Sequence, residues 1–392
     1  MRHHERYRVR RAGAAVAVGL LMTVTAACDV APPLAAEPLA AAGPGRQEPI
    51  RGADISFAPQ VEDAGGAFSD RRGVRSVEDI LADNGANWVR LRLWVDPPAG
   101  YSDLDSVKEM ALRAEEAGLE VLLDLHYSDF WADPGKQPIP AAWEGQDLDE
   151  LAQTVRTYTR DVIAELAAQG SPVDMVQIGN EVTAGMLWPV GEIYAEDPGR
   201  WSEFATLVQA GIDGARAGNP EGHDLRTMIH IDRGGDNAGA RWFYDHLLEQ
   251  GVDFDVIGLS FYPFWHGTLT DLRDNLHDLA ARYDRDIVVV ETAYAWTLDN
   301  GDDLTNFITS PSDLLDGYPA TPVGQEDFVR DLRAVVRSVP AGHGLGFFYW
   351  EPEWLPVVGW EPGAGNPNDN MTLFDWEGQA LPSIDVFGRN RR

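Results

Sequence analysis

The sequence has almost no cysteine: Cys28 is the only one among 392 residues. No disulfide can form within the chain, so its stability has to come from a packed core. Hydrophobic residues make up 44% of the chain and charged residues 24%, as in an ordinary globular protein. This composition excludes a chain that is disordered throughout, a collagen-like fibre and a coiled coil.

Lysine is also scarce, with Lys108 and Lys136 as the two examples. The chain has 63 Asp and Glu against 31 Lys and Arg, which gives a net charge of −32. Such an acidic chain repels phosphate backbones, so we expect no nucleic-acid partner. The acidity suits solubility in an external medium of variable salt. No feature implies a protein partner, and we expect a monomer.

The sequence lacks a hydrophobic run long enough for a comfortable membrane span. A basic start is followed by a small, apolar run over residues 12–27, which predicts an export signal at residues 1–28. Cys28 stands where a bacterial lipoprotein carries its lipidated cysteine, although Thr25 replaces the usual aliphatic residue. The alternatives are a lipid anchor on Cys28, the sole membrane contact expected, or free secretion after a later cut. Residues 29–48 are rich in Ala, Pro and Gly and predict a flexible linker.

From residue 49 onward, short apolar or β-branched runs alternate with longer amphipathic stretches. Several runs are almost continuously apolar, which is typical of strands buried on both faces. Eight such units predict a single (β/α)8 TIM barrel, of the α/β class, over residues 49–388. The alternative, an open doubly wound sheet, usually has a glycine-rich phosphate loop after its first strand, which this sequence lacks. The predicted strands are 50–56, 87–94, 119–126, 173–180, 226–231, 254–262, 287–291 and 345–350, and the predicted helices include 106–117, 148–168, 201–217, 238–250, 269–283 and 325–339.

Two glutamates each end a hydrophobic strand, Glu181 the fourth and Glu291 the seventh. In a barrel these strand ends share one face. Two carboxylates across a sugar cleft can hydrolyse a glycosidic bond, one as a protonated acid and the other ionised. The alternative for either glutamate alone is a salt bridge to a strand arginine such as Arg92. Both interpretations are compatible, because an arginine beside Glu291 would keep it ionised while an apolar setting keeps Glu181 protonated.

Three other polar residues near strand ends have a chemical use. The Asn180 amide could bind the sugar hydroxyl beside the anomeric centre, where a hydrogen bond strengthens in the transition state. Tyr262 could donate a hydrogen bond to the nucleophile carboxylate. His126 could do the same or bind a sugar hydroxyl, but a structural histidine with satisfied ring nitrogens is an equal alternative.

Thirteen tryptophans are present, several of them in predicted loops. Flat indole rings suit the C–H faces of pyranose sugars, although some of these rings could simply cover the barrel ends. The loops offer little basic charge beyond Lys136 and Arg233, which favours a neutral polymer over a polyuronate. The predicted substrate-binding residues are Arg92, His126, Asp129, Trp131, Lys136, Asn180, Tyr262, Trp296 and Trp350.

Two predicted loops, at residues 299–306 and 366–370, are dense in side chains with oxygen atoms. Calcium takes six to eight oxygen ligands from such side chains and from backbone carbonyls. The spacing does not match an EF-hand. The alternative is two solvated polar loops without a metal.

The chain resembles the endo-β-1,4-galactanases of glycoside hydrolase family 53 from about residue 50 to residue 376. The longest and most specific match is LDLHYSDFWADPGKQ at 123–137. The resemblance implies that Glu181 is the acid/base and Glu291 the nucleophile of a retaining enzyme, with carboxyls about 5–5.5 Å apart. It also implies endo-cleavage of β-1,4-galactan, the side chain of pectic arabinogalactan. The other matches are RGADIS (51–56), VRLRLW (89–94), QIGNE (177–181), GLSFYP (258–263), ETAY (291–294), YWEP (349–352) and LFD (373–375).

Bacterial members of this family carry a calcium ion that ties together the last two large loops. This sequence departs from their pattern at Asn300, where an aspartate is expected, and at Leu304, where a histidine is expected. One carboxylate fewer should weaken the site. The ligand set implied by the resemblance is Asn300, Asp302, Leu304 through its carbonyl, Asn306, Asn366 and Asp369.

Two alternatives remain at this stage. Another retaining endo-glycanase of the same clan, such as a mannanase, would have the same catalytic pair and would differ in polysaccharide preference. A surface lipoprotein that captures oligosaccharides without cutting them would bind and release no reducing ends. Intact Glu181, Glu291 and Asn180 argue against the second alternative, because a pure binding protein needs no acid and nucleophile.

Overall fold

The computed structural model describes residues 49–98, 100–195 and 199–388. The predicted export signal (1–28), the linker (29–48) and Cys28 lie outside these residues. The described residues belong to one compact unit. Among the described residues, no helix combines the length and the apolar character needed to cross a bilayer.

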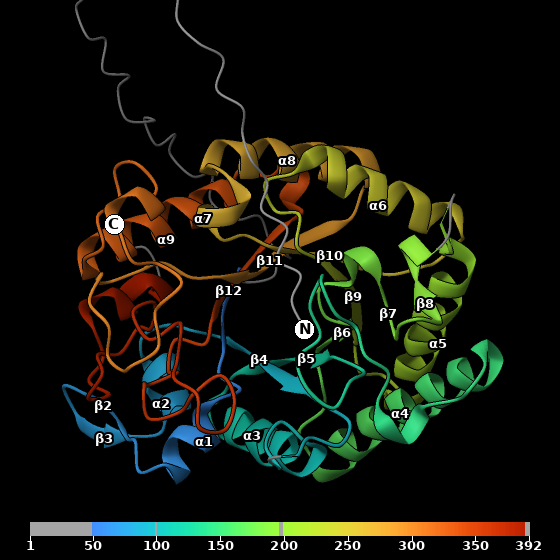
Figure 1. Ribbon diagram of the computed structural model, residues 1–392, viewed down its shortest axis with the longest axis horizontal. Helices are drawn as coiled ribbons and strands as arrows, with labels where there is room; N and C mark the ends of the chain where they lie inside the picture. The colour runs from blue at the N-terminus through green and yellow to red at the C-terminus, as the bar shows by residue number, and fades with distance from the viewer. Residues whose placement is uncertain (1–48, 99, 196–198, 389–392) are drawn as a thin grey trace, which may run out of the picture. The chain divides into compact units, whose positions relative to one another are not determined.

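Eight parallel strands close into a barrel in the order β1-β12-β11-β10-β9-β6-β5-β4 (Figure 1). The barrel closes where β1 pairs with both β4 and β12. All eight predicted strands are present, and the prediction of a (β/α)8 barrel is confirmed. The barrel strands are β1 (Ile50–Asp54), β4 (Trp88–Leu93), β5 (Glu120–Leu125), β6 (Met175–Ile178), β9 (Arg226–Ile231), β10 (Val256–Ser260), β11 (Asp286–Thr292) and β12 (Gly344–Trp350).

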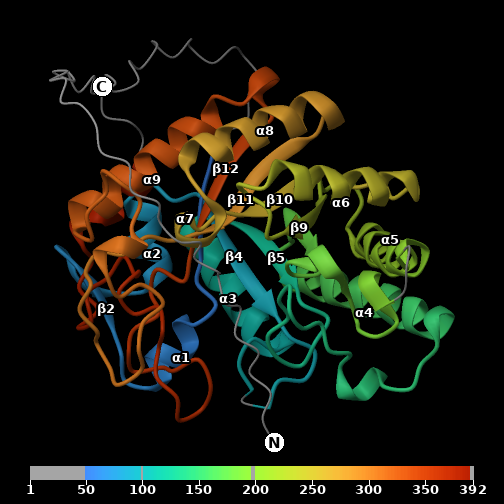
Figure 2. The same cartoon turned by 45° about the horizontal axis from the view of Figure 1, so that its top comes forward.

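Helices surround the barrel, as Figures 1 and 2 show. The first long helix, α3, begins after Asp103, whose side chain accepts a hydrogen bond from the Ser106 N–H, and ends at Gly118 in the left-handed region (φ 73°). The helices are α1 (Ala58–Asp63), α2 (Val77–Asp83), α3 (Leu104–Ala117), α4 (Leu148–Gln169), α5 (Trp201–Gly218), α6 (Asn237–Glu249), α7 (Pro263–His266), α8 (Leu269–Tyr283) and α9 (Pro322–Arg337).

In the described residues, the loops also contain short elements that the pattern of apolar residues along the sequence does not predict. Two hairpins occur, β2 (Phe68–Asp70) with β3 (Gly73–Arg75) and β7 (Gly185–Met186) with β8 (Gly191–Glu192). Short 3-10 turns add η1 (Ala141–Trp143), η2 (Val182–Ala184), η3 (Ile193–Ala195), η4 (Pro311–Asp313), η5 (Pro340–Gly342) and η6 (Pro382–Phe387).

The barrel interior changes from apolar to polar along the strands. Alternate residues of a strand point to the same face, so Trp88, Arg90 and Arg92 of β4 share one face. At the amino ends of the strands a small apolar cluster fills the barrel, made of Ile50, Trp88, Leu122, Met175, Met228, Val256, Val288, Val290 and Phe348. Toward the carboxyl ends, buried charged and polar side chains replace it. The reactive chemistry therefore gathers at the carboxyl end, as in other barrels of this kind.

Candidate active site

A pocket of about 330 Å³ opens at the carboxyl ends of the strands. Both predicted catalytic glutamates line it. Charged and polar residues form its floor, and aromatic rings form much of its wall. The main lining residues are Asp54, Arg90, Arg92, Asp124, His126, Trp131, Asn180, Glu181, Asp232, Tyr262, Trp265, His266, Glu291, Phe307, Trp350, Trp360 and Asn368.

The backbone brings the two glutamates together by different means. After β6 the chain turns through Gly179 (φ 81°) and Glu181 (φ 45°), a left-handed conformation that costs a non-glycine residue energy and is common at functional sites. Glu291 lies near the end of β11, where the pairing with β10 shifts between Leu259 and Ser260. As a result, an oxygen of each glutamate and a ring nitrogen of His230 lie within 4.8 Å of one another.

Glu291 is held by groups that favour its ionised form. Its Oε1 lies 2.9 Å from Arg90 Nη1, and its Oε2 accepts hydrogen bonds from Tyr262 Oη (3.1 Å) and Ser260 Oγ (3.3 Å). Burial raises the pKa of Glu291, while the Arg90 charge and the Tyr262 hydrogen bond oppose that rise. The contact expected from Tyr262 to this carboxylate is therefore present.

Fewer groups stabilise the ionised form of Glu181 than that of Glu291. Burial and then the charge of Glu291 raise the pKa of Glu181 well above its usual range. One hydrogen bond opposes this, donated by Ser260 Oγ to Oε1 at 2.6 Å. When the two carboxyls share one proton, the proton therefore belongs on Glu181, since Glu291 alone has a salt bridge to Arg90.

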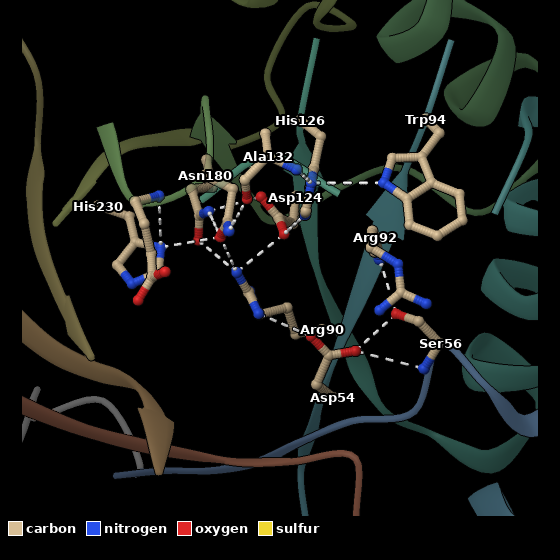
Figure 3. A network of polar contacts seen from close by, with 12 residues as sticks. Asp54, Ser56, Arg90, Arg92, Trp94, Asp124, His126, Ala132, Asn180 and His230 are labelled. Atoms are coloured by element: carbon tan, nitrogen blue, oxygen red, sulfur yellow. Dashed lines mark hydrogen bonds and ion pairs between the residues drawn. The ribbon is translucent and has the colours of Figure 1, made fainter. Parts of the chain in front are cut away.

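Arg90 connects the floor of the pocket, as Figure 3 shows. Besides Glu291 it contacts Asp54 (2.7 Å) and Asp124 (2.8 Å), and it donates to Asn180 Oδ1 (2.8 Å). Burial works against an ionised Asp124, but Arg90 and then His126 outweigh it and lower the pKa of Asp124 to about 2. With a further hydrogen bond to Gln177 Oε1 (3.3 Å), Arg90 contacts three carboxylates and two side-chain amides.

The alternative of a salt bridge between a glutamate and a strand arginine holds for Arg90 and Glu291, not for Arg92, the example given for it. Arg92 follows Arg90 by two residues on β4, and its Nη1 lies 2.7 Å from Glu351 Oε1. Its guanidinium lies over the rings of Trp131 (4.2 Å), Trp94 (4.7 Å) and Phe57 (4.8 Å), and only 1% of the residue is exposed. Arg92 therefore lines the pocket and supports its aromatic wall, and Arg90 is the arginine beside Glu291.

Sequence reasoning missed His230. It is fully buried, and burial followed by the Arg90 charge holds its pKa well below the usual range, so the ring is neutral. Nδ1 lies 3.1 Å from Asn180 Oδ1, and Nε2 lies 2.7 Å from Ser260 Oγ. A histidine within the apolar second half of β9, on the same face as Met228, was the available signal.

Ser260 links His230 to Glu181. Its hydroxyl has one proton, so it donates to Glu181 when that carboxylate is ionised. When Glu181 is protonated, the carboxyl can donate to Ser260 Oγ and the hydroxyl can turn to His230 Nε2. The sequence placed Ser260 at a strand end but gave it no role, because its neighbours come from other strands.

Six of the nine predicted substrate contacts line the pocket: Arg92, His126, Trp131, Asn180, Tyr262 and Trp350. The Trp350 ring meets the Tyr262 ring edge-on at 6.2 Å, and Trp131 stacks on Trp360 at 4.5 Å. The Asn180 side chain is already fixed, since its Nδ2 donates to the Ala132 carbonyl (2.9 Å). These residues form a rigid set before substrate arrives.

Of the two alternatives for His126, a sugar contact or a structural histidine, the structure favours the second. Its Nε2 hydrogen-bonds Asp124 (2.9 Å), and its Nδ1 accepts from the Ala132 N–H (3.2 Å) and from Trp94 Nε1 (3.4 Å). Both ring nitrogens are occupied, and burial lowers its pKa. In this arrangement, neither ring nitrogen is free for a sugar hydroxyl.

Three other predicted contacts are absent from the pocket lining. The Asp129 carboxylate accepts hydrogen bonds from the N–H groups of Asp96 (3.1 Å) and Ala141 (2.8 Å), and so connects two loop segments. Lys136 is half exposed beside Asp133 (3.7 Å). Trp296 packs against Trp376 and donates to Thr372 Oγ1 (3.3 Å). All three were assigned from their positions in loops, and loop position alone does not fix which way a side chain points.

The aromatic wall contains rings that were not assigned to the site. Trp265 and Phe307, 57% and 41% exposed, meet edge-on at 5.6 Å. They come from α7, after β10, and from the loop after β11, so they stand on the Glu291 side of the barrel order. Trp360, from the loop after β12, joins them at 6.3 Å from Phe307. Such a wall suits the apolar faces of sugar rings.

The six residues proposed to hold calcium are brought together. Asp302 accepts from the N–H groups of Leu304 (2.7 Å) and Asn366 (2.6 Å), so it bridges the two loops. Asn306 donates to Asp369 Oδ1 (2.8 Å), and Asn300 Nδ2 donates to the Leu304 carbonyl (2.5 Å). Burial raises the pKa of Asp369, and Asn306 Oδ1 is buried without a hydrogen-bond partner.

Comparison with known proteins is consistent with this site. Residues 50–387 match the family described as Glycosyl hydrolase family 53. The chain is 47% identical over 345 residues to an uncharacterized protein in the bgaB 5' region of Niallia circulans (86% of this chain, 93% of the relative). It is 39% identical over 344 residues to arabinogalactan endo-beta-1,4-galactanase A of Aspergillus niger (86% and 93%). The structure superimposes on the family 53 catalytic domain from Ignisphaera aggregans with a TM-score of 0.82 and 41% identity, covering 88% of this chain and 97% of that one.

Proposed function

The chain belongs to glycosyl hydrolase family 53 and is a glycoside hydrolase, and from this premise we propose that it is an exported endo-β-1,4-galactanase acting on the galactan of pectic arabinogalactan. The relatives named as arabinogalactan endo-beta-1,4-galactanases support this substrate. The pocket supports it too, since its aromatic wall and paired charges suit a neutral polymer.

In the proposed mechanism Glu181 is the acid/base and Glu291 the nucleophile. Glu181 donates its proton to the leaving oxygen while the Glu291 carboxylate attacks the anomeric carbon, which gives a covalent glycosyl-enzyme. Glu181, now ionised, then removes a proton from water as the water releases the sugar with its configuration retained. Ser260 stabilises the ionised Glu181 between these steps, since its hydroxyl donates to that carboxylate.

One observation carries the proposal: oxygens of Glu181 and Glu291 lie within 4.8 Å of each other in the pocket. Retaining glycosidases hold their carboxyls about 5–5.5 Å apart, whereas inverting enzymes need about 6.5–9.5 Å to admit a water. The short separation supports retention. The Arg90 salt bridge to Glu291 supports Glu291, and not Glu181, as the ionised nucleophile.

The test is the release of reducing ends from linear β-1,4-galactan, with galactomannan and carboxymethylcellulose assayed in parallel. Rapid shortening of galactan alone is the expected result. Cleavage of galactomannan alone would contradict the substrate but keep the mechanism, and would favour a mannanase. Binding without cleavage of any polymer would overturn the enzyme and favour an oligosaccharide-binding lipoprotein. Glu291→Gln is the inactive control.

We also propose that Ca²⁺ binds between the loops that contain Asp302 and Asp369. Two carboxylates and the unpartnered Asn306 Oδ1 fit a hard cation that prefers oxygen, and the ion would tie the loops together. Calcium should raise the midpoint of thermal unfolding relative to EDTA, because it binds the folded state. Asn300→Asp, which adds a carboxylate, should increase this shift, and Asp302→Asn should remove it. Equal midpoints with calcium and EDTA in all three proteins would contradict the site.

The cellular location is proposed from the sequence alone. Residues 1–28 act as an export signal, and Cys28 is the site of a lipid anchor. Mass spectrometry of the mature protein from its bacterial host tests this. A lipid-modified amino-terminal cysteine is the expected result, and a terminus beyond Cys28 would show free secretion.

A further inference from the structure

An aromatic pair lies on the surface outside the pocket. Four aromatic side chains of the described residues are strongly exposed: Trp265, Phe307, Tyr194 and Trp242. The first two line the pocket. The other two, 57% and 38% exposed, lie parallel to each other, with an interplanar angle of 7° and centroids 5.7 Å apart. We call this pair, Tyr194 and Trp242, the aromatic platform.

The platform has rigid support from below. Trp242 projects from α6 and meets Trp201, the first residue of α5, at 5.1 Å, and His246 at 4.9 Å. Trp201 is 6% exposed and stacks on His246 at 5.0 Å. Large exposed rings cost solvation energy, so rings held firmly in water usually serve binding.

The platform is connected to the catalytic pocket by a pair of charges. Asp232 lines the pocket and accepts a hydrogen bond from Thr183 Oγ1 at 2.5 Å, two residues after Glu181. Arg233 Nε lies 3.3 Å from Asp232. Both charges also act on the Tyr194 hydroxyl: burial raises the pKa of Tyr194, Arg233 opposes the rise and Asp232 adds to it. Asp232 and Arg233 also lie in the short segment between β9 and α6, the helix that carries Trp242, so this segment connects the pocket with the platform.

The side on which the platform lies follows from the chemistry. Glu181 protonates the leaving oxygen, so the leaving-group part of the chain lies on the Glu181 side. Tyr194 comes from the segment after β6, which also carries Glu181, and Trp242 comes from α6, which follows β9, the barrel neighbour of β6. The platform therefore lies on this same side. The exposed rings Trp265 and Phe307 stand on the Glu291 side instead.

We propose that the aromatic platform is a distal binding site for the leaving-group side of a neutral β-linked galactan chain, beyond the sugar that Glu181 protonates. The exposed outer face of this stacked pair accepts the C–H face of a sugar, while Asp232 and Arg233 offer an acceptor and donors to the hydroxyls. The site rests on the proposed function, since it extends the same substrate chain. It makes the enzyme favour long polymers over short oligosaccharides.

Tyr194→Ala tests the platform, because Tyr194 is exposed and its loss should spare the fold. An aromatic contact contributes about 0.5–1.5 kcal/mol, so KM for long galactan should rise roughly 2- to 12-fold. The kcat and KM for a short chromogenic galactooligosaccharide, whose leaving group ends within the pocket, should not change. Tyr194→Phe keeps the ring and should behave as wild type. Leu112→Ala, which removes an exposed apolar side chain from α3, is the matched control.

Binding to long galactan, measured by affinity electrophoresis in the inactive Glu291→Gln background, gives a second readout. Tyr194→Ala should weaken this binding by the same factor. Unchanged KM and binding, in a wild-type enzyme that cleaves galactan, would overturn the platform and leave the proposed function intact. Equal losses on long and short substrates would also overturn it. If wild type cleaves another polymer instead, the galactan assignment fails, and the occupant proposed here fails with it.

Discussion

At the scale of single residues, the site works by giving two identical side chains different surroundings. Glu291 has Arg90 and the Tyr262 hydroxyl as partners, with Ser260 further away, whereas the Ser260 hydroxyl is the close side-chain partner of Glu181. Glu291 is buried and Glu181 is partly buried, so their partners decide which one holds the proton. The activity should therefore need Glu181 protonated and Glu291 ionised, which gives a bell-shaped dependence of kcat/KM on pH.

Removing each glutamate should give different leaving-group dependence. Glu181→Ala removes proton donation and should lower kcat about 10²–10⁴-fold on galactan. A galactoside with an acidic phenol as leaving group needs no proton, so glycosylation by this variant should be largely restored. Glu291→Ala removes the attacking oxygen and should stay inactive on both substrates. Kinetics with galactan and with a dinitrophenyl galactobioside check this, and rescue of Glu291→Ala would reverse the two roles.

Ser260→Ala should shift the alkaline limb of the pH profile upward. The Ser260 hydrogen bond opposes the raised pKa of Glu181, so its loss lets that pKa rise further and the acid stays protonated to higher pH. The kcat should also fall, since Glu181 loses its positioning contact. The kcat/KM measured across pH checks this, with Ser260→Thr as the variant that keeps the hydroxyl. An unmoved alkaline limb would show that Ser260 has only a structural role.

At the scale of elements, the strands aim side chains and the helices hold the strands in place. The irregular pairing of β10 with β11 sets Ser260 opposite Glu291 although Leu259 is opposite Val289. A bulge of this kind re-aims one side chain without moving the strand. Such shifts depend on both strands at once.

Helix α4 depends on the capping box at its start. The Asp147 side chain accepts from the Glu150 N–H (3.0 Å), and the Glu150 side chain accepts from the Asp147 N–H (3.1 Å). Asp147→Ala should lower the free energy of unfolding by about 1 kcal/mol. Asp147→Asn keeps a good cap and should lose much less. Urea unfolding checks this at constant pH, and equal losses in both variants would show that the carboxylate charge matters more than the cap.

At the scale of the whole molecule, the acidic chain buries several carboxyls beneath its pocket. Glu351 and Glu353 are both fully buried. Burial and then Asp54 raise the pKa of Glu351 to about 8, although Arg92 opposes them. Burial and then Glu351 raise the pKa of Glu353 well above its usual range. Folding therefore favours the protonated forms of this pair.

This pair should make the protein less stable at alkaline pH. A carboxyl with a folded pKa above its unfolded value of about 4.3 binds its proton more tightly when folded, so its contribution is full at low pH. That contribution falls as pH rises from about 4.3 toward the folded pKa, about 8 for Glu351. Glu353→Gln removes one of the two groups and should flatten the decline.

Urea unfolding between pH 5 and pH 8 measures this effect. The difference in unfolding free energy between Glu353→Gln and wild type should grow in favour of the variant as pH rises. Glu249→Gln, at the exposed end of α6, is the matched control and should follow the wild type. A constant difference across this range would contradict a protonated Glu353 in the fold.

The barrel and the two pocket glutamates are evident from local patterns in the sequence. Strand periodicity and strand ends are local properties, so the eight strands and the positions of Glu181 and Glu291 at strand ends could be predicted. The aromatic wall was predicted in kind, because tryptophans cluster in the loops. Trp131 and Trp350 line the pocket, whereas Trp296 does not.

The contacts between side chains of different strands and loops are evident in the folded structure and not in the sequence. Arg90 and Arg92 share one face of β4, and the register between strands, together with the chain turn at Glu351, gives Glu291 to the first and Glu351 to the second. His230 and Ser260 gain their roles from residues on other strands. The platform of Tyr194 and Trp242 joins segments some fifty residues apart. These contacts depend on strand register and loop packing, which one stretch of sequence cannot specify.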